Sequence, residues 1–141
     1  MEARVANDFE VAVDVGAPPD QVWALAGDPG RIGEWFAPVV ACEMDGGRRT
    51  VTMGNGTVLV ERIERDDTAR AYSYMVLSGI PGLTSHRATI RVVEAPGGSR
   101  VLWRQTATSE VEGYDVESRL GAVMTAGLER LRDVVEGRSA A

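Results

Sequence analysis

The residue with the clearest chemical potential in this sequence is its single histidine. His86 lies in a stretch, Ser85 to Glu94, in which Arg87 and Arg91 alternate with apolar residues. Side chains of a β-strand alternate between two faces, so placing both arginines in water turns His86 inward. An imidazole in a mostly apolar pocket can take or give a proton near neutral pH. His86 is therefore the first candidate for an acid or a base.

Glu61 is the second candidate catalytic residue. Its carboxylate can orient His86, or it can act as a base itself if burial raises its pKa. The parity of its strand, Thr57 to Arg65, is ambiguous because two sets of side chains can face inward. These sets are Leu59, Glu61 and Ile63, or Val58 and Val60.

Gln105, Tyr72 and Tyr74 supply amide and hydroxyl groups that can hold a carbonyl or a phenol. Together with His86 and Glu61 they can support enolisation, aldol cyclisation or dehydration of an aromatic or polyketide-like substrate. The alternative is that His86 is a hydrogen-bonded residue of a cavity or its rim, and that Glu61 is solvated or paired with an arginine. The residues alone leave both interpretations open.

The other reactive side chains indicate no further site. Cys42 is the only cysteine, so no internal disulfide can form, and a small buried apolar role is expected for it. No phosphate loop, Ser-His-Asp order or Cys/His cluster stands out, so neither a metal nor a cofactor is expected. Arg48, Arg49 and the scattered acids are interpreted as a solvated surface.

A long helix, expected from Tyr114 to Gly137, is the main element that must position these groups. Its apolar residues recur every three or four positions, as in an amphipathic helix. Asp115 is the expected N-cap and Gly137 the expected stop. Gly121 and Gly127 interrupt the helix; either the sheet or a ligand approaches closely there, or the helix simply tolerates them. The apolar stripe consists of Val116, Leu120, Val123, Met124, Leu128, Leu131, Val134 and Val135.

The rest of the chain is expected to form seven strands and two short helices. Strands joined by short turns must be antiparallel neighbours, and Asn55-Gly56 is a strong hairpin signal. The first short helix begins at Pro18-Pro19-Asp20, and Asp28 can cap a second that holds Ile32, Trp35 and Phe36. The first seven residues and the last four are expected to fray. The strands are expected at residues 9–15, 39–44, 49–53, 57–65, 70–77, 85–94 and 100–108.

This order of elements predicts an α+β fold with an interior cavity. A large antiparallel sheet twists and curls, and the long helix is the one element able to cover its concave face. The two short helices are expected to plug one end, and the loop from Ser78 to Leu83 to lie near the mouth. The helix from Leu128 to Val135 should seal against the sheet, whereas Leu120 to Gly127 should border the cavity.

Length and charge limit the classes of function. A chain of 141 residues is expected to be a single domain, residues 1–141 with a core of about 8–137. The net charge of −6 argues against a general nucleic-acid or anionic-membrane binder, because both need a basic face. With no signal-peptide pattern and no run of 18 apolar residues, a cytoplasmic protein without stable membrane insertion is expected.

Short motifs along the whole chain resemble a known superfamily. They are Ala17-Pro18-Pro19 leading to Val22-Trp23, Trp35 before a proline, Glu61-Arg62-Ile63, Tyr72-Ser73-Tyr74, and Trp103 ahead of Gly127-Leu128-x-x-Leu131. With the element order, these motifs resemble the helix-grip (SRPBCC) superfamily of START lipid-transfer domains, the birch-pollen-allergen (Bet v 1-like) fold, plant abscisic-acid receptors and polyketide cyclase/dehydrases. The likeness is closest to small bacterial polyketide cyclase/dehydrase-like proteins.

The resemblance implies a curved seven-stranded antiparallel sheet wrapped around the C-terminal helix. The abscisic-acid receptors place a glutamate of an equivalent Glu-Arg-Leu stretch in the pocket, so the resemblance favours the inward orientation of Glu61. The side chains expected to contact a ligand are Trp35, Phe36, Leu59, Tyr72, Tyr74, Val76, Ala88, Trp103, Gln105, Leu120, Val123, Met124 and Gly127.

The expected function is binding of a small hydrophobic molecule, whether aromatic, polyketide-like or lipid-like. The favoured form is a cyclase or dehydratase, a lyase or isomerase, that uses His86 and Glu61 as acid and base. One alternative is a non-catalytic carrier or sensor, and a second is an interaction module of the co-chaperone or toxin type. The sequence does not determine the oligomeric state, and a homodimer is left open.

Overall fold

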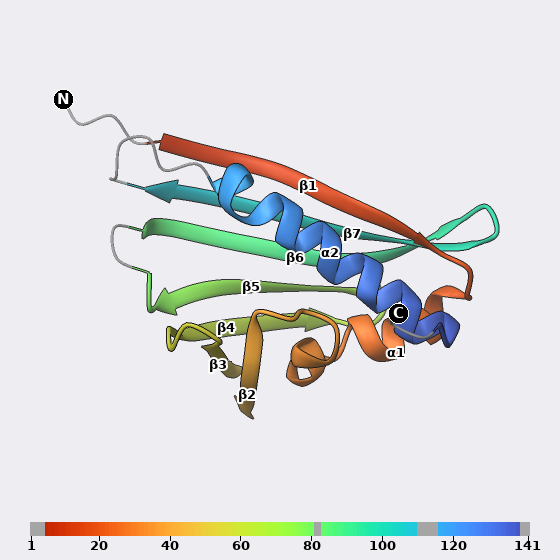
Figure 1. Ribbon diagram of the computed structural model, residues 1–141, viewed down its shortest axis with the longest axis horizontal. Coiled ribbons are helices and arrows are strands. Elements are labelled where there is room, and N and C mark those ends of the chain that lie inside the picture. The colour runs from red at the N-terminus through yellow and green to blue at the C-terminus, as the bar shows by residue number, and fades with distance from the viewer. Residues whose placement is uncertain (1–4, 81–82, 110–115, 139–141) are drawn as a thin grey trace.

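The computed structural model describes residues 5–80, 83–109 and 116–138. Seven strands form one antiparallel sheet in the order β1-β7-β6-β5-β4-β3-β2 (Figure 1). This is the predicted helix-grip α+β fold. In chain order the elements are β1 (Val5–Val15), α1 (Pro19–Ala26), η1 (Pro29–Glu34, a 3-10 helix), β2 (Val39–Asp45), β3 (Arg48–Met53), β4 (Val58–Asp66), β5 (Ala71–Ser78), β6 (Leu83–Ala95), β7 (Gly98–Ser109) and α2 (Val116–Glu136).

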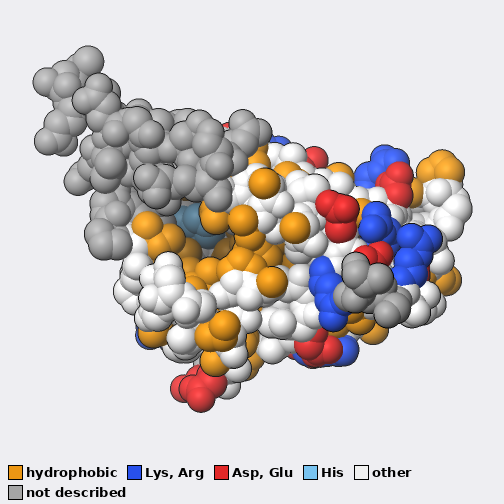
Figure 2. Space-filling view, viewed as in Figure 1, with side chains coloured by type: hydrophobic (Ala, Val, Ile, Leu, Met, Phe, Trp, Pro, Cys, Tyr) orange, Lys and Arg blue, Asp and Glu red, His pale blue; other side chains and the backbone are white. Residues whose placement is uncertain are grey.

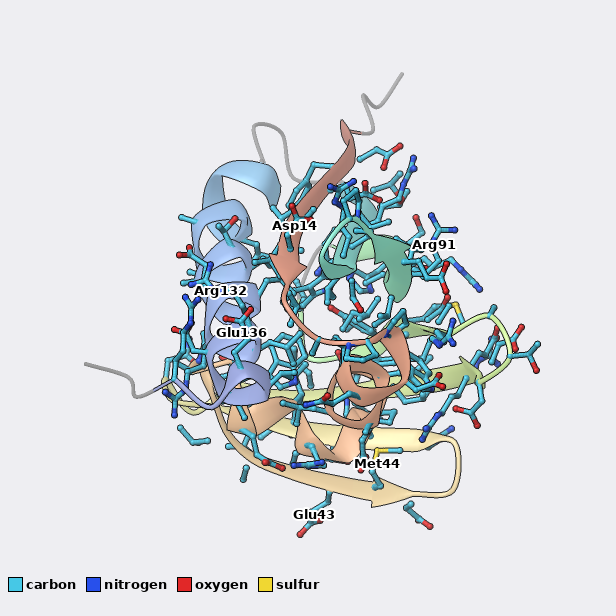
Figure 3. The ribbon with its side chains drawn as sticks, turned by 90° about the vertical axis from the view of Figure 1, so that its right-hand side faces the viewer. Asp14, Glu43, Met44, Arg91, Arg132 and Glu136 are labelled. Carbon is cyan, nitrogen blue, oxygen red and sulfur yellow. The ribbon has the colours of Figure 1, made fainter. Side chains whose placement is uncertain are left out.

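The helix α2 crosses one side of the curved sheet (Figure 1). Met124, Leu128 and Leu131 lie on its inner face and are fully buried. Full burial of each such side chain contributes about 1.5–3 kcal/mol. Figure 3 shows Arg91 of β6 on the opposite side of the sheet from α2, as strand parity predicts. The sheet therefore has one face in the core and one in water.

The C-terminal end of α2 is fixed by the glycine that the sequence predicts. Gly137 has a φ of +72°, and the N–H of Arg138 donates to the carbonyl of Asp133 at 2.7 Å. This geometry is a Schellman motif, which satisfies carbonyls at the helix end. Glu136 then accepts a hydrogen bond from the backbone N–H of Gly16 at 2.8 Å, which ties the helix to the end of β1 (Figure 3). The expected N-cap, Asp115, lies outside the described residues.

The prediction of a frayed N-terminus is wrong from Val5 onward. β1 begins at Val5, which pairs with Ser109, and the register continues without a break to Val15 and Ser99. β7 is long enough to offer backbone partners along the whole of β1, so these residues form ladder hydrogen bonds. The alternation of apolar residues begins only at Phe9, so the sequence pattern did not predict the first residues of β1.

The two short helices pack at one end of the sheet, and their caps follow the sequence. Asp28 Oδ1 accepts a hydrogen bond from the N–H of Gly30 at 3.1 Å, as expected for the cap of η1. η1 is shorter than predicted, because Trp35 is its C-cap and Phe36 lies beyond it. Trp23 of α1 donates from Nε1 to Asp67 at 3.0 Å, which fastens α1 to the turn between β4 and β5.

The turn between β6 and β7 is closely packed against the segment that joins β1 to α1. A Cβ on Gly98 would lie 2.4 Å from the carbonyl oxygen of Val15 and 2.7 Å from the nitrogen of Ala17. Beside it, Ser99 Oγ donates to the carbonyl of Ala17 at 2.6 Å. Gly97 also has a positive φ, but nothing lies within 4 Å of its added Cβ.

We predict that Gly98→Ala lowers the free energy of unfolding by about 3 kcal/mol or more, because left-handed strain and a backbone clash add together. Gly97→Ala is the matched control and should lose only about 1 kcal/mol through strain alone. Urea denaturation followed by circular dichroism measures both. Equal losses in the two variants would show that the close packing at Gly98 is not needed.

Candidate functional site

A cavity of about 230 Å³ lies between the sheet and α2. Figure 2 shows the hollow from the helix side, with hydrophobic side chains around it and the pale blue of histidine inside. Its wall is largely apolar, with a few polar side chains. The lining residues are Ile32, Phe36, Val39, Arg49, Val51, Met53, Asn55, Thr57, Leu59, Glu61, Tyr74, Val76, Ile80, His86, Trp103, Gln105, Leu120 and Met124.

The sheet opens beside this cavity because β5 and β6 stop pairing part-way along. Their described register ends at Tyr74–Ala88, although both strands continue. If the pairing continued in the same register, Val76 would lie opposite His86, two residues beyond the last pair. The pairing of β4 with β5 is also irregular here, between Val60 and Glu61. The gap between β5 and β6 gives the interior room at this point.

The His86 side chain bridges that gap. The backbone N–H of Val76 donates to His86 Nδ1 at 3.2 Å, so the imidazole replaces a ladder carbonyl. An amide N–H can only donate, which leaves the proton of the neutral imidazole on Nε2. His86 Nε2 lies 2.7 Å from Gln105 Oε1 and donates to it. Both ring nitrogens are therefore engaged.

Tyr74 and Gln105 meet across Ala88. These three residues occupy one row of the sheet, with Ala88 in the middle. Because the alanine side chain is small, Gln105 Nε2 can donate to the Tyr74 hydroxyl at 3.1 Å. Trp103 Nε1 donates to the same hydroxyl oxygen at 3.0 Å. A polar network thus runs from β5 across β6 to β7 along the cavity wall.

A buried ion pair forms another part of the wall. Arg49 and Glu61 lie opposite each other on β3 and β4, and Arg49 Nε donates to Glu61 Oε1 at 2.7 Å. Both side chains are at least 96 % buried. Arg49 Nη1 also donates to the carbonyl of Pro29 at 3.0 Å and to the Tyr72 hydroxyl at 3.3 Å. Its guanidinium lies 4.9 Å from the centre of the Tyr74 ring.

Burial shifts the pKa of several of these groups. It lowers the pKa of His86, and the hydrogen bond with Gln105 opposes only part of that change. It raises the pKa of the Glu61 carboxyl, against the charge of Arg49. It also raises the pKa of the Tyr74 hydroxyl, which stays protonated. The imidazole is therefore neutral at neutral pH.

The structure brings together both predicted catalytic residues and most of the predicted ligand contacts around one cavity. Strand parity is correct for β5, β6 and β7, and the ambiguity of β4 resolves in favour of Glu61. The predicted residues that line the cavity are His86, Glu61, Phe36, Leu59, Tyr74, Val76, Trp103, Gln105, Leu120 and Met124.

Five expected ligand contacts do not line this cavity. Tyr72 is buried against Trp23 and Arg49, and Ala88 lies in the row between Tyr74 and Gln105. The other three lie at a separate surface groove between η1 and α2. There, a Cβ on Gly127 would lie 2.9 Å from the Phe36 ring, so an aromatic side chain rather than a ligand explains this glycine. The three residues at the groove are Trp35, Val123 and Gly127.

Of the alternatives left open for Glu61, the structure shows the pair with an arginine, and the surface assignment of Arg49 is wrong. Glu61 does not orient His86, because Glu61 pairs with Arg49 and His86 bonds to Val76 and Gln105. Arg49 is not part of a solvated surface, since only 1 % of its side chain is exposed. Arg48 is exposed as expected. Cys42 is half-buried, and its Sγ lies 3.8 Å from the carbonyl of Pro29.

The sequence contained two signals that Arg49 faces the cavity and lies opposite Glu61. The hairpin loop at residues 54–56 places Met53 opposite Thr57, since the N–H of Met53 donates to the carbonyl of Thr57 at 2.8 Å. Counting back from that pair sets Arg49 opposite Glu61. Arg49 also shares strand parity with two apolar residues, Val51 and Met53, which line the same cavity. The remaining residues that we did not predict are Ile32, Val39, Asn55, Thr57 and Ile80.

Among the described residues, no group of three or more His, Cys, Asp or Glu side chains could hold a metal ion. No helix in the described part of the chain is long and apolar enough to cross a membrane.

Comparison with known proteins assigns the fold to a family. A family model described as "Polyketide cyclase / dehydrase and lipid transport" matches residues 6–136. The chain belongs to this family. The fold is the Bet v 1-like helix-grip fold. A search of curated proteins found no significant match.

Solved structures support the same fold. The chain is similar to the protein XoxI from Bacillus cereus, with a TM-score of 0.80 and 22 % identity over 92 % of this chain and 96 % of that one. It is also similar to a protein from Thermobifida fusca, with a TM-score of 0.72 and 29 % identity over 94 % and 93 % of the two chains. Ara h 8.0201 has a TM-score of 0.73 and 17 % identity over 95 % of this chain and 100 % of that one.

The ion pair yields the first prediction from the site. Arg49→Met should lower the free energy of unfolding by about 3–5 kcal/mol, because it leaves the Glu61 carboxylate buried without its partner. The double variant Arg49→Met/Glu61→Leu should recover at least half of that loss. Arg104→Met is the matched control, since it breaks an exposed, solvent-screened pair with Asp8 and should change the free energy of unfolding far less than Arg49→Met. Urea denaturation of all four proteins tests this, and no recovery in the double variant would contradict it.

The second prediction concerns His86. Its imidazole should titrate in the folded protein with a pKa below the ordinary 6.5 and carry its proton on Nε2 when neutral. Folding favours the neutral imidazole. The contribution of His86 to the free energy of unfolding is therefore present above about pH 6.5 and is lost as the pH falls through the pKa of the folded state. Nitrogen-15 NMR of the single histidine measures both the tautomer and the pKa. A pKa at or above 6.5, or an Nδ1–H tautomer, would contradict the geometry.

Proposed function

We propose that the protein binds a small, largely apolar molecule in the cavity between the sheet and α2, and holds it without chemical conversion. The observation that carries this proposal is the cavity itself, which is lined by apolar side chains and by polar groups already bonded to one another. An apolar wall with a few oriented polar groups is the usual composition of a small-molecule site.

The volume of the cavity limits the size of the ligand. A dry apolar cavity of about 150 Å³ in another protein binds benzene. The cavity here is about 230 Å³ and is therefore suited to a substituted single ring or two fused rings. A long acyl chain would need space that the described wall does not offer.

The polar groups support binding more than catalysis. A general base needs a free lone pair within hydrogen-bond reach of the substrate proton. His86 uses both nitrogens in bonds to Val76 and Gln105, and Glu61 is held by Arg49. Acid and base chemistry by His86, as in a cyclase or dehydratase, would first require one of its two bonds to break, and the charge of Glu61 is already paired with Arg49. A carrier or a sensor is therefore the function that the geometry favours.

The interaction-module interpretation requires a filled interior and a large exposed apolar patch. The cavity argues against the first requirement. The large apolar side chains that are exposed in the described residues, such as Val40 and Met44 on β2, Val58 on β4 and Leu77 on β5, belong to several strands.

Filling the cavity tests the proposed function. Leu59→Trp should place an indole in the cavity and lower the affinity for 1-naphthol and acetophenone at least tenfold. Val58→Trp is the matched control, because Val58 is the next residue on β4 and is 47 % exposed on the other face. Isothermal titration calorimetry measures binding, and native mass spectrometry shows whether the purified protein retains a molecule from the cell. Equal affinities in the two variants would refute binding in this cavity, and conversion of a retained molecule would refute a purely binding role.

A further inference from the structure

The hydrogen bonds on the cavity wall have a fixed direction, and the direction is set by one backbone group. The N–H of Val76 can only donate, so His86 Nδ1 accepts and His86 Nε2 carries the proton. His86 Nε2 then donates to Gln105, which requires the amide oxygen of Gln105 to face it. The amide nitrogen of Gln105 must therefore face Tyr74, as it does at 3.1 Å. If the Gln105 amide were reversed, its NH₂ group would face His86 Nε2. A proton on Nε2 would then oppose that NH₂ group, and a proton on Nδ1 would oppose the N–H of Val76.

This series of hydrogen bonds, from Val76 through His86 and Gln105, ends at the Tyr74 hydroxyl. In the described part of the chain, the hydrogen of that hydroxyl is left without a partner, and we call it the surplus hydrogen. That oxygen accepts from Gln105 Nε2 and from the indole N–H of Trp103, which can only donate. A hydroxyl has two lone pairs and one hydrogen, so both lone pairs are used. The hydroxyl hydrogen has no acceptor among the described residues. Leaving such a donor unpaired in an apolar interior is unfavourable, so a binding partner that accepts it gains affinity.

The surplus hydrogen lies at the cavity. Tyr74 lines the cavity, as do both residues that donate to its hydroxyl. Met124 of α2, which also lines it, lies 3.7 Å from Gln105 Nε2 through its sulfur. The hydroxyl is therefore surrounded by side chains that border the space for a ligand. Tyr74 is 95 % buried, so water does not compete freely for this donor.

We infer that the Tyr74 hydroxyl donates a hydrogen bond to the bound ligand, and that the site takes uncharged one- or two-ring molecules that carry an acceptor such as a ketone oxygen. This inference rests on the proposed function. A ligand that can only donate finds no acceptor at Tyr74, because both lone pairs of its oxygen are used. Charged ligands are disfavoured because Arg49 and Glu61, the charged residues of the described wall, already neutralise each other.

The test uses two molecules of the same shape, acetophenone and α-methylstyrene, in which a carbonyl oxygen replaces a methylene group. Titration calorimetry gives the dissociation constants of both for the wild-type protein, Tyr74→Phe and Tyr72→Phe. The ratio of affinities, acetophenone over α-methylstyrene, should fall about three- to tenfold in Tyr74→Phe, which is the range that one hydrogen bond supplies. Tyr72→Phe removes a neighbouring hydroxyl that bonds to Arg49 outside the cavity lining, and should leave the ratio unchanged.

Infrared spectroscopy provides a measurement on the wild-type protein alone. The carbonyl stretching band of bound acetophenone should lie at lower frequency than in hexane, and in Tyr74→Phe it should move back toward the hexane value. A hexane-like band in the wild-type protein, or an unchanged ratio in Tyr74→Phe, overturns the inference while leaving binding in the cavity intact. If neither molecule binds the wild-type protein, the proposed function fails together with the inference. Retained α-methylstyrene affinity in Tyr74→Phe shows that the variant is folded.

Discussion

The burial of the Arg49 guanidinium is the constraint on which the cavity wall formed by β3, β4, β5 and η1 depends. A charged group in an apolar interior is tolerated only when it is paired and its hydrogen bonds are satisfied. Here the partners come from three elements, because Glu61 lies on β4, Tyr72 on β5 and the carbonyl of Pro29 on η1. The guanidinium on β3 thus sets where η1 rests against the sheet. The short helix cannot move without breaking a charge-assisted bond.

The same rule of satisfied polar groups explains the opposite wall. Where β5 leaves β6, the amide of Val76 loses a ladder partner, and the His86 ring replaces it. The rest of the network follows from that substitution, through Gln105 to Tyr74. The single histidine therefore has a structural explanation that needs no proton transfer. Its lowered pKa is consistent with this role, because a protonated imidazole would oppose the N–H of Val76.

Much of the fold could be predicted from periodicity and turn chemistry. The element order, the antiparallel sheet and the stop at Gly137 all follow from local patterns that tertiary packing reinforces. Strand parity also placed His86, Tyr74 and Gln105 on the inner face. Parity assigns a face and not a neighbour, so it could not show that Tyr72 and Ala88 lie in the core while Tyr74 reaches the cavity. Parity also left open whether Glu61 orients His86 or pairs with an arginine, and the register decides for the pair with Arg49.

The early end of pairing between β5 and β6 determines how two portions of the sheet are held together. Beyond Tyr74 and Ala88, the described residues link the β1-β7-β6 portion of the sheet to the β5-β4-β3-β2 portion through the side chains of His86 and Arg87 in place of backbone hydrogen bonds. At that row the described backbone ladders do not fix the distance between the two portions, which is therefore set by side-chain contacts. A closed barrel holds its strands together with continuous ladders of backbone hydrogen bonds, whereas here the packing of side chains around the interior holds part of the sheet.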